Sequence, residues 1–530
     1  MTTFKTVFFD DDYLETIMSH SASHGRSVRE MSFASLQALS GVGDPGKFGR
    51  MFPFLPPQSA SDDALFALAQ AMVDLAGDEG DNPGVPAGYT YLGQFIDHDI
   101  TLDTTPLSVQ MEDPLATTNF RSPAVDLDAM YGDGPDVQPG LFDRDPVTFK
   151  MTQKMLIGST QLSFDPAGGQ VQVLANDLPR NQVGRAVIND PRNDENLLVA
   201  QTHLLFLKFH NKVIDLLVAT RPGLTGSALF DEAQRIVRWH YQWIVLFDFV
   251  ERLTEPGLVR RIKQEGRRFY RFKSRPYMPA EFAAAAYRLG HSMVREVYSY
   301  NRVFRPGGGI PATLALLFNF TGKSGNIVGG LAPQPETDPV GPIHALPSNW
   351  AVDWRRFYDL GTAPAAPDFT LNHARRLDPL IVPALHALPG EAGRGALLPF
   401  RNLRRGVILG LPSGQDVARA MGFAPLTEAE ITMDSGGSGD GAVLKAQNLH
   451  LQTPLWYYIL KEAKVKHEGR RLGPVGSTLL AETFLGMVHG DHKSFLWLRA
   501  NWVPELPGET PGHFTMADLV RFVDDINPVG

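Results

Sequence analysis

One short stretch of the sequence brings an imidazole, an amide and two carboxylates together. It reads Gln94-Phe-Ile-Asp-His-Asp99 and lies within an apolar stripe of helical spacing. In a helix, Gln94 and His98 share a face, while Asp97 and Asp99 diverge from His98 by about 100° to either side. Imidazoles transfer protons and bind metals, and burying so many polar groups without a purpose would be costly. The stretch is a candidate functional site, and a surface histidine stabilised by neighbouring acids is the open alternative.

A second stretch places an arginine and a glutamate at the start of a long apolar segment. Asp190-Pro-Arg-Asn-Asp-Glu-Asn196 has a proline near its beginning and acids in its first turn, which is typical of a helix N-terminus. Residues 197–217 are apolar on nearly every side, which predicts a buried helix. Arg192 and Glu195 could form a salt bridge with each other, or both could contact a ligand.

A third stretch, residues 279–294, combines strong helix formers with one smooth side. Gly290 immediately precedes His291, and small residues let something large and flat approach. Close packing of two helices around a core histidine is the alternative. Farther along, Asn402, Arg404 and Arg405 bring an amide and two guanidinium groups into an apolar neighbourhood, but alone they decide nothing.

The remaining histidines are weaker candidates. His203 and His210 are two helical turns apart, so core histidines with hydrogen bonds are favoured over metal ligands. His489 and His492 could suggest a zinc hydrolase, but a third ligand pattern and a His-Glu-x-x-His motif are missing. The chain contains no cysteine, which excludes disulfides, thiolate ligation of haem and iron–sulfur clusters.

The overall charge argues against a nucleic-acid partner. The 530-residue chain carries a net charge of −9, and its one basic run extends from Arg260 to Arg275. Such a run is usually a solvated helix face. The N-terminus lacks the pattern of a secretory signal, and no stretch is apolar enough to span a membrane. We therefore expect no transmembrane segment and either a cytoplasmic location or export by a non-classical route.

The elements that must position these residues are mostly helices. Helical periodicity dominates, with breaks at proline- and glycine-rich clusters. The clearest strand signal is a hairpin of residues 161–164 and 170–174, and the glycine-rich segment Ser435–Gly441 is predicted to be a flexible surface loop. Because no repeat or clean linker is visible, we expect an N-terminal extension (1–40) and one large, mainly α domain (41–530) with a few short β-hairpins.

Taken together, these stretches resemble the signature of the animal-type haem peroxidases, the peroxidase–cyclooxygenase superfamily. Each motif is weak alone, but their order and wide spacing also match, and the resemblance covers roughly residues 40–500. The matching segments are Gln94-Phe-Ile-Asp-His-Asp99 (distal helix), Asp190-Pro-Arg-Asn-Asp-Glu195 (distal arginine), Arg288-Leu-Gly-His291 (proximal) and Asn402-Leu-Arg-Arg-Gly406 (proximal support).

The resemblance implies a mainly α fold, a bound haem b and a role for each residue. His98 would be the distal acid–base residue with Arg192 as its partner, and Gln94 would fix a distal water or a halide. His291 would bind the haem iron, with Asn402 accepting from its other ring nitrogen, and Arg288 and Arg405 would neutralise the haem propionates. The expected activity is reduction of hydrogen peroxide via a ferryl haem, followed by oxidation of small donors such as phenols, halides or thiocyanate.

Two further features are implied by the resemblance. Asp97 and Glu195 match the carboxylates that form ester bonds to haem in family members, whereas Asn196 stands where one branch has a methionine that forms a third link. Asp99 matches a ligand of a structural calcium ion, whose other ligands would be Ser122, the Ala124 carbonyl, Asp126 and Asp128.

Departures from the family pattern leave alternatives open. Val407-Ile-Leu replaces a polar run after the asparagine motif, which suggests a divergent, bacterial-type branch. One alternative is a haem-dependent fatty-acid dioxygenase, which would need a tyrosine at the haem, with Tyr358 in the plausible region. Another is a haem-binding protein without turnover. The donor, the halide preference and the oligomeric state do not follow from the sequence.

Overall fold

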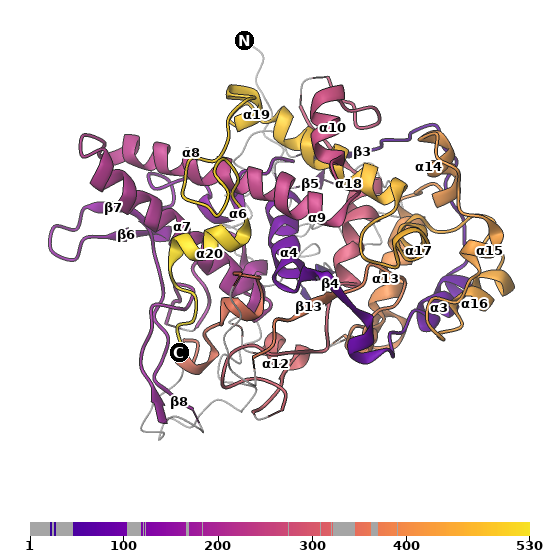
Figure 1. The fold of residues 1–530 in the computed structure, drawn as a ribbon, viewed down its shortest axis with the longest axis horizontal. Helices are drawn as coiled ribbons and strands as arrows, with labels where there is room; N and C mark the ends of the chain where they lie inside the picture. The colour runs from indigo at the N-terminus through magenta and orange to yellow at the C-terminus, as the bar shows by residue number, and fades with distance from the viewer. Residues whose placement is uncertain are drawn as a thin grey trace, which may run out of the picture.

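Helices dominate the computed structural model, and the strands are short (Figure 1), as expected for the mainly α class. The structure describes residues 22–23, 26–27, 46–102, 118–119, 121, 123–165, 169–182, 184–273, 275–307, 309–319, 321, 345–361, 369–388 and 391–530. In these ranges, every helix is too short or too polar to cross a lipid bilayer.

The longer α-helices carry most of the core. α7 is buried for most of its length, and residues from Met51 to Val529 join one hydrophobic cluster. These helices are α3 (Asp62–Ala71), α4 (Gly88–Ile100), α7 (Leu197–Thr220), α8 (Gly226–Ile244), α10 (Leu258–Glu265), α12 (Leu314–Asn319), α13 (Leu398–Ile408), α14 (Gly414–Ala420), α16 (Asp440–Ala446), α17 (Leu455–His467), α18 (Pro474–Gly490) and α20 (Met516–Val523).

Short helical segments connect the longer ones. The single-turn α-helices are α6 (Asp128–Tyr131), α9 (Glu251–Leu253), α11 (Ala280–Ala283), α15 (Glu428–Ile431) and α19 (Phe495–Leu498). The 3₁₀ segments are η2 (Gly77–Gly80), η3 (Pro139–Leu141), η4 (Pro191–Asp194), η6 (Ala286–His291), η7 (Ser348–Trp350), η8 (Trp354–Arg356), η9 (Pro383–His386) and η10 (Gly393–Ala396).

The strands form small, separate sheets. One sheet has the order β10-β3-β5, with β3 parallel to β10 and antiparallel to β5, and the other described sheets are antiparallel pairs. The pairs join β1 (Ala22–Ser23) to β2 (Arg26–Ser27), β4 (Asp81–Pro86) to β13 (His373–Arg375), β6 (Phe142–Arg144) to β7 (Met151–Met155), β8 (Ser163–Asp165) to β9 (Gly169–Val171) and β11 (Val297–Tyr298) to β12 (Ala312–Thr313). The three-stranded sheet consists of β3 (Gly46–Gly49), β5 (Thr118–Asn119) and β10 (Met278–Pro279).

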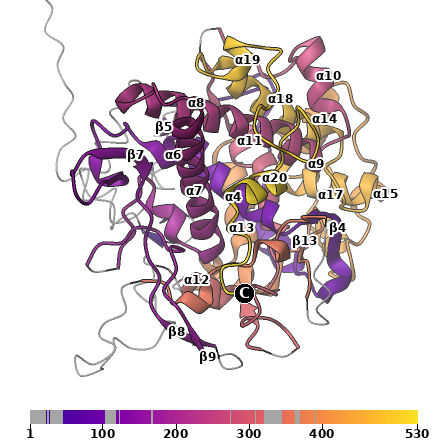
Figure 2. The same cartoon turned by 60° about the vertical axis from the view of Figure 1, so that its left-hand side comes forward.

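The helix α4 lies near the middle of the molecule in both views of the ribbon (Figures 1 and 2). Phe95 of α4 stacks on Phe206 of α7, with ring centroids 5.0 Å apart and planes only 6° from parallel. This contact fixes one side of α4 against the long helix α7. The adjacent helix continues from α8 through a π-helical segment, η5 (Val245–Val250), into α9, and insertions of this type are frequent near functional sites.

Several predictions of local structure need correction. The continuous helix expected over residues 279–294 is broken into α11 and the 3₁₀ segment η6, because tertiary packing overrides a helix propensity of this size. The turn opened by Asp190 is the separate segment η4, after which Asn196 caps α7. The predicted hairpin is present as β8 and β9.

The glycine-rich segment Ser435–Gly441 is anchored in the protein rather than loose on its surface. Ser435 and Asp440 are buried, and the hydroxyl of Ser435 donates to the Asp440 carboxylate. The ammonium group of the fully buried Lys461, on α17, donates to the Ser435 hydroxyl at 2.8 Å. The prediction of a flexible loop is therefore wrong at its two ends, because the side chains that flank the glycines find buried partners.

Candidate functional site

A cavity with an empty volume of about 890 Å³ separates α4 from η6. This volume counts all space between the lining atoms, including space open to solvent. Gln94 and Asp97 line it on the α4 side, and Arg288 and His291 line it on the η6 side. The remaining lining residues are mostly apolar: Tyr89, Thr90, Tyr91, Gly93, Asn196, Phe249, Tyr287, Leu289, Gly290, Met293, Val294, Leu314, Phe318, Leu385, Leu388 and Leu398.

His291 stands at the C-terminal end of η6 with one ring nitrogen held from behind. The side-chain amide of Asn402, on α13, lies 2.7 Å from its Nδ1. The contact expected between these two residues is therefore present. Burial, and then the charge of Arg288, lower the pKa of His291 to about 3, so the imidazole is neutral at physiological pH.

The contact with Asn402 leaves Nε2 available for a metal. The oxygen and nitrogen of an amide exchange places when the group rotates by half a turn, and the hydrogen-bond network decides between them. When Nδ1–H of His291 donates to the amide oxygen, the lone pair of Nε2 stays free, which is the form of histidine that binds metals.

Gly290 opens the cavity toward this imidazole. A Cβ atom placed on Gly290 would meet no atom beyond its chain neighbours within 4 Å, so empty space lies directly beside the backbone. The expectation that a small residue next to His291 leaves room for a large group agrees with this observation. A neutral, half-buried imidazole, an empty slot and a mostly apolar lining fit a haem.

The opposite wall carries a polar pair from two elements. The Oε1 atom of Gln94 accepts from the Nδ2 atom of Asn196 at 2.9 Å, and the Oδ1 atom of Asn196 caps the start of α7. Asp97 accepts from the Thr101 hydroxyl at 3.0 Å and is 8% exposed. Gln94 and Asp97 are therefore both in position to contact a group bound in the cavity.

His98 is fully buried, so its interpretation as a surface histidine is wrong. Its Nδ1 atom lies 2.8 Å from Oδ1 of Asn193, and Nδ2 of Asn193 lies 2.8 Å from Nδ1 of His203. Because an amide oxygen only accepts, Nδ1 of His98 carries the proton in this arrangement and Nε2 is the basic nitrogen. Burial, and then the charge of Arg192, lower the pKa of His98 to about 4.

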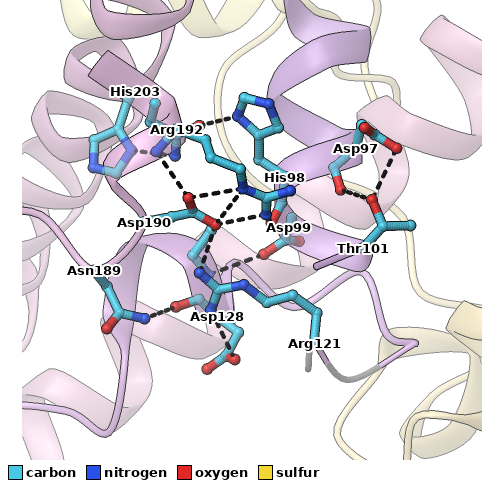
Figure 3. A network of polar contacts seen from close by, with 12 residues as sticks. Asp97, His98, Asp99, Thr101, Arg121, Asp128, Asn189, Asp190, Arg192 and His203 are labelled. Carbon is cyan, nitrogen blue, oxygen red and sulfur yellow. Dashed lines mark hydrogen bonds and ion pairs between the residues drawn. The ribbon is translucent and has the colours of Figure 1, made fainter. Parts of the chain in front are cut away.

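His98 and Arg192 do not line the cavity itself. The guanidinium group of Arg192 donates to the backbone oxygen of His98 at 2.8 Å and to the carboxylate of Asp190 (Figure 3). Arg121 donates to the same carboxylate at 2.7 Å from the other side. Although burial opposes ionisation of Asp190, the charges of Arg192 and Arg121 hold its pKa well below the ordinary value.

Of the other residues predicted to contact haem, some line the cavity and others lie outside its lining. Glu195 is buried at the end of η4 but does not line the cavity, whereas its neighbour Asn196 does. Arg288 lines the cavity and donates from Nε to the carbonyl of Ala283 at 3.0 Å. Arg405 lies close enough to lower the pKa of His291, although burial and Arg288 contribute more.

Three polar residues of this region were not singled out from the sequence. Asn193 follows Arg192 directly in the motif, but its contact with His98 depends on how two distant segments meet. Asn196 was considered only for a missing covalent link, although it holds Gln94. Arg401 precedes Asn402 and contributes to the positive field at His291. Their positions inside the motifs mark these residues as candidates for the site, but the local sequence does not show what they contact.

The predicted calcium ligands meet only in part. Both carboxylate oxygens of Asp99 accept from backbone amides, those of Leu127 at 3.0 Å and Ala129 at 3.2 Å. Burial raises the pKa of Asp99 to about 6 and also raises the pKa values of Asp126 and Asp128. Ser122 lies outside the described residues, and Ala124 is in the same loop.

Within the described ranges, no group of three or more His, Asp or Glu side chains is arranged to hold a metal ion. This also removes support for a zinc site at His489 and His492, both of which are exposed. His203 and His210 are buried and hydrogen bonded, as expected for core histidines, and Nδ1 of His210 lies 2.9 Å from the hydroxyl of Tyr131.

Comparison with known proteins agrees with this geometry. A model of the animal haem peroxidase family matches residues 101–312. The chain is 25% identical over 352 residues to Peroxidasin of Drosophila melanogaster, covering 65% of this chain and 20% of that protein. It is 28% identical over 219 residues to a peroxidase-like protein of Margaritifera margaritifera, covering 41% of this chain and 26% of that protein.

Solved structures with this fold include a peroxidase and dioxygenases. Peroxidase A from Dictyostelium discoideum superimposes with a TM-score of 0.56 at 16% identity, covering 92% of this chain and 94% of that chain. Fatty acid alpha-dioxygenase from Oryza sativa superimposes with a TM-score of 0.56 at 14% identity, covering 97% of this chain and 88% of that chain. At such identities the likeness concerns the fold alone.

The sequence matches and the fold point to one class of protein. Residues 101–312 match the animal haem peroxidase family, and the chain has a fold found in a peroxidase and in fatty acid alpha-dioxygenases. It spans only a fifth and about a quarter of the length of the two curated relatives named above.

Proposed function

We propose that this chain is a haem peroxidase that reduces hydrogen peroxide and oxidises small electron donors. The observation that carries the proposal is the cavity between α4 and η6, with the His291–Asn402 pair on one wall and Gln94 and Asp97 on the other. The match of residues 101–312 to the animal haem peroxidase family supports the same activity. A bound haem would supply the redox chemistry that side chains lack, taking electrons from donors and passing them to peroxide.

His291 would hold the iron through Nε2, and Asn402 would keep the imidazole oriented by accepting from Nδ1. Arg288 would pair with a carboxylate at the porphyrin edge, since it lines the cavity next to His291. We assign the second carboxylate to Arg405, with Arg401 adding to the positive field. Gln94, fixed by Asn196, would position a water or a halide ion on the opposite face.

His98 would move the proton during peroxide cleavage. Its low pKa keeps the ring neutral, so Nε2 can accept a proton from one peroxide oxygen and return it to the departing oxygen, which then leaves as water. Arg192 is locked by Asp190 beside the same residue and would stabilise the charge that develops.

The test is a comparison of haem-loaded wild type with His98→Ala and the control His450→Ala, which removes a histidine that contacts the carbonyl of Leu444 instead of Asn193. Peroxide-driven oxidation of a phenol, bromide and thiocyanate should fall by roughly 10²–10⁴-fold in His98→Ala alone. Equal activity of all three proteins would show that His98 is not the acid–base residue. If wild type binds haem but never turns over peroxide, the non-catalytic haem-binding alternative is correct.

A fatty-acid dioxygenase is the second candidate, favoured by tyrosines and an apolar end in the cavity. Tyr358 does not line the cavity, and its buried hydroxyl donates to the Gly88 carbonyl at 3.1 Å. Tyr287 does line it, next to Arg288 and beside several leucines. Oxygen uptake with a fatty acid that is lost in Tyr287→Phe, with phenol oxidation retained, would favour this candidate.

We also propose that an ester bond to the haem forms at Asp97 rather than at Glu195. Asp97 lines the cavity on the wall facing His291, whereas Glu195 does not reach the lining. After turnover with peroxide, acid–acetone extraction should leave haem on the wild type and on Glu195→Gln but remove it from Asp97→Asn. Haem retained by Asp97→Asn would contradict the assignment.

For calcium, we propose a structural site at Asp99, Asp126 and Asp128, with the Ala124 carbonyl and Ser122. Its support is the raised pKa of each carboxyl group, since a bound cation would relieve the cost of keeping these buried groups ionised. Removal of calcium by a chelator should lower the unfolding temperature of wild type and have no effect on Asp126→Asn. An unchanged unfolding temperature in wild type would argue against the site.

A further inference from the structure

One face of the molecule gathers basic side chains that take no part in the proposed reaction. Residues 258–275 contain eight lysine and arginine residues but only one acidic residue, in a chain of net charge −9. Leu258, Val259 and Ile262 of α10 are buried, so the helix turns its basic side chains outward. Within the described residues, no ion pair forms with the exposed Arg260, Arg261, Arg268 or Arg271.

This behaviour differs from that of arginines elsewhere in the chain. Arg121, Arg180 and Arg375 each contact carboxylates and are largely buried. Unpaired cations that repel one another lower stability, and a surface with no partner gains nothing from concentrating them. An external partner with negative charge would use them.

Exposed apolar side chains lie on the same face. The ammonium group of Lys263, on α10, donates to the carbonyl of Ala500 at 3.0 Å, just beyond α19. Both ribbon views show α10 and α19 together at one end of the molecule (Figures 1 and 2). In α19 the side chains of Trp497 and Leu498 are 52% and 57% exposed, although Phe495 and Leu496 beside them are buried. Lys493 adds further positive charge beside them, whereas Arg499 forms an ion pair with Glu505.

Basic residues around an exposed tryptophan and leucine are suited to one kind of partner. Lysine and arginine attract anionic lipid headgroups, while tryptophan and leucine enter the boundary between headgroups and acyl chains. A membrane is flat and contacts only this face. The negative charge on the rest of the chain therefore stays away from the lipid. A long nucleic acid would also meet the acidic remainder and would have no use for Leu498.

We propose that the face formed by residues 260–275 and 493–499 docks this protein on anionic lipid membranes. The basic side chains provide attraction, and Trp497 and Leu498 insert at the headgroup level. Docking of this kind is reversible and weakens as salt is added, because screened charges contribute less. It would hold the cavity near a membrane, although no helix in the described part of the chain is long and apolar enough to cross one.

The test is co-sedimentation of the full chain with vesicles. Wild type should sediment with vesicles of equal amounts of phosphatidylserine and phosphatidylcholine, but not with phosphatidylcholine alone, and high salt should release it. In the variant Arg260→Gln/Arg261→Gln/Arg268→Gln/Arg271→Gln, affinity should fall roughly five-fold for each charge removed, or several-hundred-fold in total. Trp497→Ser should weaken binding by a smaller factor that does not depend on salt.

A matched control removes the same number of charges elsewhere. Lys150, Lys212, Lys445 and Arg470 are exposed and lie outside this face, and their replacement by glutamine should leave vesicle binding nearly unchanged. All variants should keep wild-type unfolding temperatures and peroxide-driven oxidation, since none alters the cavity. The inference is wrong if wild type ignores anionic vesicles, if the control loses as much affinity as the four-arginine variant, or if an oligonucleotide binds this face while vesicles do not.

Discussion

The two walls of the cavity are built in opposite ways. Beside α4, a network of buried charges and amides surrounds His98, with Asp190 clamped between Arg121 and Arg192. On the η6 wall, one imidazole–amide contact joins His291 to Asn402, which lies 111 residues farther along the chain. Charged and amide side chains from several segments meet on the first wall, whereas the contact of His291 with Asn402 on the second wall joins neutral groups.

This difference indicates what each wall contributes. Buried charges must be paired for the chain to fold at all, so the geometry around His98 is fixed before any cofactor binds. The contacts of the His291 wall, such as the Tyr287 hydroxyl donating to the Gly93 carbonyl at 2.9 Å, join neutral groups, so its final order should depend more on the cofactor. Changes near His98 should therefore lower the stability of the apoprotein, whereas changes near His291 should mainly lower its affinity for haem.

The largest effect is expected from Asp190→Asn. This change leaves two buried guanidinium groups without their shared anion, which should cost about 3–5 kcal/mol in the free energy of unfolding. Denaturant titration of the apoprotein measures it, with the exposed Asp231→Asn as the control. A loss no larger than that of Asp231→Asn would show that the α4 wall does not depend on this anion.

The same carboxylate should also produce an acid-sensitive stability. Burial opposes its ionisation, but the two arginines hold its folded-state pKa well below the ordinary value, so its contribution is fully present above about pH 4. That contribution is lost as the pH falls from there through the folded-state pKa. In titrations below pH 4, wild type should lose stability more steeply than Asp190→Asn.

A smaller effect is expected from Asn193→Leu. It removes the amide that contacts both His98 and His203, which should cost about 1–3 kcal/mol and release the tautomer of His98. The control Asn211→Leu removes two hydrogen bonds to the backbone of Met155, away from the cavity. Both variants should lose similar stability, but only Asn193→Leu should lose peroxide-driven oxidation. Equal activities would mean that Asn193 has a structural role only.

On the other wall, Asn402→Ala should act mainly on the cofactor. Removing the group that orients a metal-binding histidine typically lowers metal affinity by about 10–100-fold. Haem titration followed by absorbance should show this loss, while the apoprotein keeps nearly the stability of wild type. A large fall in apoprotein stability without a change in haem affinity would reverse the proposed difference between the walls.

The smallest effect is expected away from both walls. Asp63 forms an ion pair with Arg394 on the surface, where the two side chains are 84% and 46% exposed. Asp63→Asn should change the free energy of unfolding by less than about 1 kcal/mol, because water screens the pair. A loss comparable with that of Asp190→Asn would show that burial is not what makes the α4 network strong.

The sequence predicted the chemistry of the site better than its exact geometry. The motifs predicted the contact of Asn402 with His291 and the positions of Gln94 and Asp97 on the cavity wall. The residues of each motif serve the same site, so their relation can be inferred from the sequence. The mainly α class follows from periodicity that extends over many residues. The roles of His98, Arg192 and His291 and the division into residues 1–40 and 41–530 stay predictions.

What the sequence did not show depends on contacts between distant segments. The alanine-rich stretch before His291 favours a helix locally, but packing against α4 and α18 breaks it into two short turns. Asn193 and Lys461 gain their partners only when the chain is folded. The same reasoning explains why Ser435 is buried although glycines surround it.

The most direct test of the account is the iron–imidazole vibration in resonance Raman spectra of the reduced, haem-loaded protein. The band should be present in wild type and in His98→Ala. It should disappear in His291→Gly and return when free imidazole is added. If the band persists in His291→Gly without imidazole, or if His98→Ala abolishes it, another residue holds the iron and the assignment of the two walls is wrong.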